Sequence, residues 1–78
     1  MTRDEAQAWF VQFLMERVRE DTYPSATHLA LIEESIPQEM VSEYLEILLE
    51  KVADDMWPSI PMLRRIQRVA QSLPLVEE

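Results

Sequence analysis

Three residues in the first half of the chain have the types needed for nucleophilic catalysis. His28, the single histidine among 78 residues, follows Asp21 and Ser25. A hydroxyl, an imidazole and a carboxylate act as nucleophile, base and orienting group when a fold brings them together. The second half repeats the serine as Ser59 but has Met62 in place of the histidine. Helix capping explains the serine in both halves, so we predict no catalytic residues and no enzymatic activity.

Metal and cofactor sites are not expected either. A zinc site needs three or four converging ligands, and the chain has one histidine and no cysteine. It also has no glycine, on which the loops that bind dinucleotides and phosphates depend. We therefore interpret His28 as a half-buried helix residue, and we predict no metal and no cofactor.

Charged side chains gather in two places. An acidic stripe consists of Glu39, Glu43, Glu46, Glu50 and Asp54. We interpret it as a solvated helix face, with binding of a basic partner or a cation as the alternative. Residues 56–72 carry three positive charges, Arg64, Arg65 and Arg68, and no negative charge. These arginines are candidate contacts to an acidic partner or to phosphates. The alternatives are compensation of a helix dipole and pairing with the acidic stripe.

Trp9 is the strongest candidate for a contact with another molecule. At helical spacing it lies outside an apolar arc that comprises Phe10, Val11, Phe13, Leu14, Met15 and Val18. Its neighbours on that side are acidic, and an exposed tryptophan is typical of an interface hot spot. The alternative is that Trp9 packs against a neighbouring helix or the tail. The arc is also wider than a four-helix monomer needs, so homodimerisation is a further alternative.

The elements that carry these residues follow from an internal repeat of 34 residues. Residues 6–36 align with residues 40–70 without gaps. Eight pairs are identical: Leu14/Leu48, Glu16/Glu50, Val18/Val52, Asp21/Asp55, Pro24/Pro58, Ser25/Ser59, Leu29/Leu63 and Ile32/Ile66. About two identities are expected by chance at average composition, so we infer a duplication. The period equals that of tetratricopeptide repeats, but that family requires a glycine and helices of similar length, so the period does not place the chain in it.

Each repeat predicts a long helix, an elbow and a short helix. The long helices are expected at 3–20 and 36–54, and the short ones at 26–34 and 60–72. The elbows are residues 21–25 and 55–59, where a proline ends the long helix and the following serine caps the short one. Capping boxes are expected at residues 2–5 and 35–38. Tyr23 and Trp57, which precede the prolines, are predicted to wedge helix against helix.

Periodicity also predicts which helix faces are buried. In the second long helix the apolar stripe is Val41, Leu45, Leu48 and Val52, with Tyr44, Ile47 and Leu49 beside it. In the last helix the apolar side is Leu63, Ile66 and Ala70, with Met62, Val69 and Leu73. We therefore predict an all-α, compact four-helix bundle built from two tandem copies of a helix–turn–helix. One domain is expected over residues 1–74, followed by a flexible acidic tail at 75–78.

Composition limits the function further. The net charge of −8 opposes binding to phosphate backbones, and no apolar run is long enough to span a bilayer. We expect a cytoplasmic, non-enzymatic protein–protein interaction or regulatory module with an unknown protein partner or itself as partner. Its contacts would be Trp9, Arg64, Arg65 and Arg68. The alternative is a nucleic-acid-associated protein that binds through the basic last helix.

Overall fold

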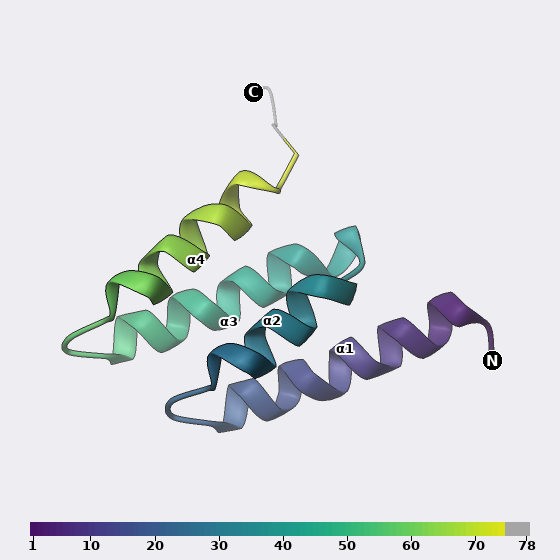
Figure 1. The fold of residues 1–78 in the computed structure, drawn as a ribbon, viewed down its shortest axis with the longest axis horizontal. Coiled ribbons are helices and arrows are strands. Elements are labelled where there is room, and N and C mark those ends of the chain that lie inside the picture. Colours follow the sequence, from purple (N-terminus) through teal and green to yellow (C-terminus); the bar gives the residue numbers. More distant parts are fainter. Residues whose placement is uncertain (75–78) are drawn as a thin grey trace. The chain divides into compact units, whose positions relative to one another are not determined.

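All regular structure in the described part of the chain is helical (Figure 1). The computed structural model describes residues 1–74. Helix α1 spans Arg3–Glu20, α2 Ala26–Ser35, the 3₁₀ turn η1 Gln38–Met40, α3 Val41–Asp54 and α4 Ile60–Gln71. The predicted all-α class is confirmed for this part. No helix within it is long and apolar enough to cross a membrane. The tail predicted at 75–78 lies outside the described residues.

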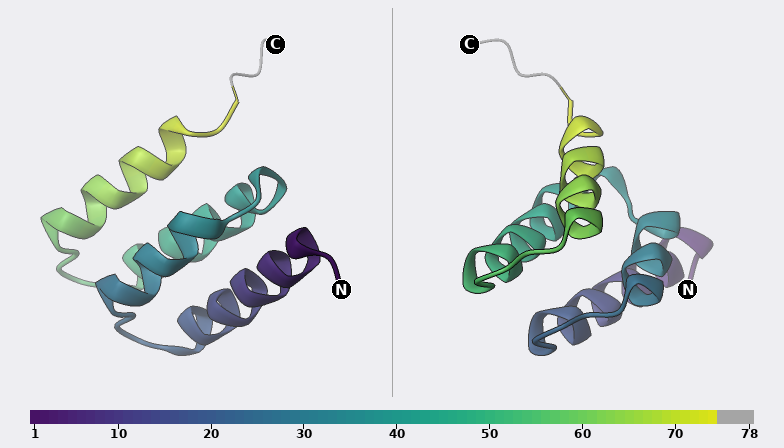
Figure 2. Two further views of the ribbon diagram at one scale, coloured as in Figure 1. Left: turned by 45° about the vertical axis from the view of Figure 1, so that its right-hand side comes forward. Right: turned by 60° about the vertical axis from the view of Figure 1, so that its left-hand side comes forward.

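The chain divides into two units, each of which is a helical hairpin. The first unit is Met1–Met40 and the second is Val41–Glu78. Helix α1 packs against α2 in the first unit, and α3 packs against α4 in the second (Figures 1 and 2). The sequence predicts that the two units pack together as one four-helix bundle in a single domain. Both the bundle and the single domain stay predictions.

The two elbows have the same local geometry. Ser25 caps α2, where its hydroxyl oxygen accepts a hydrogen bond from the His28 backbone N–H at 3.1 Å. Ser59 caps α4 in the same way, accepting from the Met62 backbone N–H at 3.2 Å. The φ and ψ angles are −73° and 147° at Ser25 and −74° and 149° at Ser59. The predicted serine caps are therefore present in both units.

The first helix begins with a variant of the predicted capping box. The Thr2 hydroxyl oxygen accepts from the Glu5 backbone N–H at 3.1 Å. The same hydroxyl donates to the Glu5 carboxylate, also at 3.1 Å. In the standard capping box the carboxylate instead accepts from the backbone N–H of the cap residue. The start of α1 at Arg3 is as predicted.

The start of the second long helix was predicted wrongly. Ser35 is the last residue of α2, so it does not cap the next helix. Ile36 is extended, with φ −66° and ψ 125°, because the residue before a proline is kept out of helical geometry. The chain then makes a 3₁₀ turn in which the Pro37 carbonyl accepts from the Met40 backbone N–H at 2.9 Å. The α-helix begins only at Val41.

Each hairpin contributes side chains to the core. The buried residues of the first unit are Val11, Leu14, Met15, Val18, Leu29 and Ile32, and those of the second are Val41, Tyr44, Ile47, Leu48 and Val69. In α3, Leu49 is exposed and Leu45 is half-buried. In α4, the buried side centres on Val69 rather than on Leu63 and Ala70, which are exposed. The apolar stripes were therefore predicted on the correct helices, but about one residue away from the core on α4.

Candidate interaction surfaces

An exposed aromatic face runs along α1. Trp9 is 70% exposed and Phe13 is 57% exposed, and Phe10 is exposed beside them. Successive residues turn by about 100° around a helix, so Trp9 lies about 180° from Val18, and Phe13 lies about 40° from Trp9. Because Val18 is fully buried, Trp9 points directly away from the core. We call Trp9, Phe10 and Phe13 the aromatic face.

Charged residues border the aromatic face. The Arg17 guanidinium lies over the Phe13 ring, with its central carbon 5.9 Å from the ring centroid. This distance is within the range of a cation–π contact. Glu16 and Glu20 are exposed on the same helix and lie within about 20° of Trp9 in the helical projection. The sequence prediction that Trp9 lies among acidic residues agrees with this arrangement.

A hollow of about 290 Å³ lies next to Trp9. Ala8, Trp9 and Gln12 line it from α1, and Met40 lines it from the end of η1. All four residues belong to the first unit. The hollow is shallow and mostly apolar, and it adds to the apolar surface beside Trp9.

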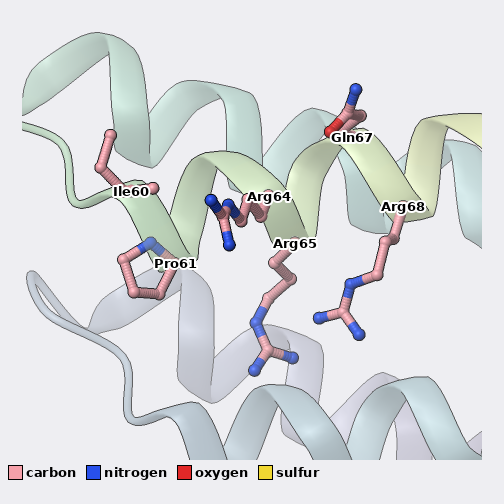
Figure 3. Close-up of a pocket in the computed structure, with 6 residues that line it drawn as sticks. All are labelled: Ile60, Pro61, Arg64, Arg65, Gln67 and Arg68. Carbon is pink, nitrogen blue, oxygen red and sulfur yellow. The ribbon is translucent and has the colours of Figure 1, made fainter.

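The three candidate arginines line one hollow along α4. Its volume is about 470 Å³, and Ile60, Pro61 and Gln67 complete its lining (Figure 3). Arg64 and Arg68 are exposed, whereas Arg65 is half-buried. Figure 3 shows Arg65 and Arg68 extending in the same direction from α4, while Gln67 points away from them. The arginines thus form a common basic surface on α4, which belongs to the second unit.

The aromatic residues of the elbows are not wedges, and that prediction was wrong. Tyr23 is 81% exposed and Trp57 is 84% exposed. Each precedes a proline in a bend between two helices, and its high exposure places its side chain outside the core of the hairpin. The wedge was predicted from the position of each ring before a proline and a serine at an elbow. That position restricts the backbone, but it does not determine whether the side chain is buried.

The residues that suggested catalysis are Asp21, Ser25 and His28. The Ser25 hydroxyl accepts from the backbone N–H of His28 and serves as a helix cap. His28 is half-buried, as expected. Every residue of the acidic stripe, Glu39, Glu43, Glu46, Glu50 and Asp54, is exposed. Within residues 1–74, no three histidine, cysteine, aspartate or glutamate residues are grouped so as to hold a metal ion.

Comparison of the chain with protein-family models, with curated proteins and with solved structures found no match. Its function must therefore be inferred from its own surfaces.

Proposed function

We propose that the chain is a non-enzymatic protein–protein interaction module that binds its partner through the aromatic face of α1. The observation that carries the proposal is the position of the three rings. Trp9 and Phe13 are more than half exposed, on the side of α1 opposite its buried residues. Tryptophan is enriched among the residues that dominate binding energy at interfaces.

The hairpin explains why this face stays uncovered within its own unit. Helix α2 packs against α1, and the buried Leu14 and Val18 lie on the side of α1 opposite Trp9. The Trp9 side has no helix of the same unit to cover it. Burial of three partly exposed aromatic rings contributes on the order of 5 kcal/mol, at roughly 25 cal/mol per Å² of apolar surface. That gain must offset the cost of association.

The basic surface of α4 would supply the polar contacts of the proposed interface. Arg64 and Arg68 are exposed next to Ile60, so charged and apolar atoms lie side by side on one helix (Figure 3). Such a surface suits the polar rim of an interface with an acidic partner.

We also propose that the two units derive from a duplication. The matching sequences support it, and so does the matching backbone geometry of the two serine caps. The copies then diverged at position 9, where Trp9 aligns with Glu43. The tryptophan at this position is therefore present in the first unit and absent from the second.

Site-specific photocrosslinking tests the proposed function. A benzoylphenylalanine at position 9 in the full chain should crosslink one identified protein, or a second copy of the chain. The same probe at position 43, an exposed helix position at the equivalent place in the second unit, serves as the matched control. The captured partner, purified, should bind Trp9→Ala at least tenfold more weakly. Equal capture from both positions, or unchanged affinity, would remove Trp9 from the interface.

The hollow on α4 favours one second candidate, which is binding of nucleic acid. Arg64, Arg65 and Arg68 line it together, and guanidinium groups bind phosphate well. The net charge of −8 opposes this function. Binding of labelled DNA or RNA should then appear at low salt, fall steeply as salt rises, and be lost in Arg64→Glu. If labelled DNA or RNA shows no gel retardation at low salt, the chain does not bind nucleic acid through α4.

A further inference from the structure

The two elbows present aromatic rings that the fold does not use. Tyr23 and Trp57 are among the most exposed large side chains of the described residues. The neighbouring Pro24 and Pro58 end the preceding helices, and the serines after them cap the next helices. The proline and the serine therefore have a structural role in each elbow, whereas the ring has none within its hairpin.

The backbone of the second elbow is restrained on both sides of Trp57. The Asp55 carboxylate oxygen Oδ1 accepts from the Trp57 backbone N–H at 3.1 Å, which closes a turn over two residues. Pro58 fixes φ on the other side, and Ser59 anchors the chain to α4. A ring on such a restrained backbone loses less conformational entropy on binding than one on a mobile loop.

Both elbows are acidic at the same places. Residues 20–25 carry two acidic residues and no basic one, and so do residues 54–59. Glu20 and Asp54 are the last residues of α1 and α3, and carboxylates are unfavourable there because a helix ends with a partial negative charge. Each elbow, together with the last residue of the helix before it, thus combines an exposed π face, two carboxylates and the carbonyl end of a helix.

We propose that each elbow binds one basic side chain, a lysine or an arginine, of a partner protein. The ring takes the cation on its face through a cation–π contact, and the two carboxylates and the helix end supply the complementary negative charge. The partner is a segment with spaced basic residues. These elbow residues differ from those of the aromatic face of α1, so the inference is independent of the function proposed above.

The matching of the elbows gives two sites of similar chemistry in one chain. Tyr and Trp both have π faces that attract cations, and Trp attracts them more strongly. The second elbow is therefore the tighter of the two.

The test uses the full chain with Trp9→Phe, which leaves Trp57 as the single tryptophan. The probe is a ten-residue peptide in which four lysines alternate with serine and glycine, and the control peptide has glutamates in place of the lysines. Binding is followed by Trp57 fluorescence and by backbone amide shifts. We expect the lysine peptide to shift the amides of residues 21–25 and 55–59 and the glutamate peptide to shift none.

Matched variants separate elbow binding from general attraction to an acidic protein. Trp57→Leu and Tyr23→Leu, followed by amide shifts, should each weaken binding at their own elbow about two- to fivefold. Asp55→Asn keeps the oxygen that accepts from Trp57 but loses the charge, and it should weaken binding to a similar extent. Glu46→Gln removes one charge from the acidic stripe and should change the affinity less than twofold. If the shifts spread equally to Glu39, Glu43, Glu46 and Glu50 of the acidic stripe, or if Glu46→Gln weakens binding as much as Asp55→Asn, the proposal is wrong.

Discussion

The Arg17 guanidinium lies over the Phe13 ring, 5.9 Å from its centroid, one helical turn further along α1. The contact joins two residues on the outer side of the helix, where Phe13 is more than half exposed. Arg17 thereby covers part of the ring and places a positive charge at the end of the aromatic face. A partner that binds this face meets both an apolar surface and one fixed cation.

Two neighbouring leucines on α3 test how the core is assigned. Leu48 is 0% exposed and Leu49 is 48% exposed; the sequence predicted Leu48 in the apolar stripe and Leu49 beside it. Leu48→Ala should lower the free energy of unfolding by about 2–5 kcal/mol, because it leaves a cavity. Leu49→Ala should lower it by less than about 1 kcal/mol. Urea denaturation followed by circular dichroism measures both, and equal losses would contradict the assignment.

Local chemistry explains why some of the fold was predictable from sequence. The serine caps and the helix ends at Pro24 and Pro58 depend only on residues close in the chain, so proline and hydroxyl chemistry was sufficient. Which apolar residues of α1 are buried and which are exposed could not be predicted in this way. Phe13 and Leu14 are equally apolar, and only the direction of α2 decides that Leu14 is buried while Phe13 is exposed.

The candidate surfaces were likewise predictable only where they follow from residues close in the chain. Trp9 was correctly placed outside the apolar arc, because the side opposite a run of core residues follows from helical periodicity. Trp57 was misplaced, because its position before a proline at an elbow restricts the backbone but does not determine whether the ring is buried. The shared hollow of Arg64, Arg65 and Arg68 follows from their spacing on one helix.

The serine caps should contribute measurably to stability. Ser25→Ala and Ser59→Ala should each lower the free energy of unfolding by about 1 kcal/mol, because the His28 and Met62 backbone N–H groups lose their acceptors. Ser25→Asn and Ser59→Asn keep a side-chain oxygen and should be nearly neutral. Thermal and urea unfolding of the four variants checks this. Losses of the same size for alanine and asparagine would show that the caps do not stabilise the helices.

The elbow tryptophan should matter little for folding. Trp57 is 84% exposed, so Trp57→Leu should change the free energy of unfolding by less than about 0.5 kcal/mol. A wedge between helices would instead cost about 3–5 kcal/mol on truncation to alanine. The urea midpoint of Trp57→Ala distinguishes an exposed ring from a ring packed between helices. A large drop in the midpoint would show that Trp57 is packed between helices.

The partner of the aromatic face is either another protein or a second copy of the chain, and a measurement of self-association distinguishes the two. A dimer held by two aromatic faces is apolar, so its mass by light scattering should be the same at low and high salt. Trp9→Glu should convert that dimer to monomer, whereas Trp57→Glu should leave it intact. A dimer that dissociates in salt would assign the contact to charged surfaces, such as the basic surface of α4.

Collisional quenching of Trp9 fluorescence tests the central claim most directly. The protein carries Trp57→Phe, so that Trp9 is the single tryptophan, and it is studied at micromolar and lower concentrations. Because Trp9 is 70% exposed, acrylamide should quench it nearly as efficiently as it quenches a tryptophan in the urea-unfolded chain. Addition of the partner should then reduce the quenching. Strong protection of Trp9 in the isolated monomer would show that the chain covers the aromatic face itself, and that result would contradict its role as a binding surface.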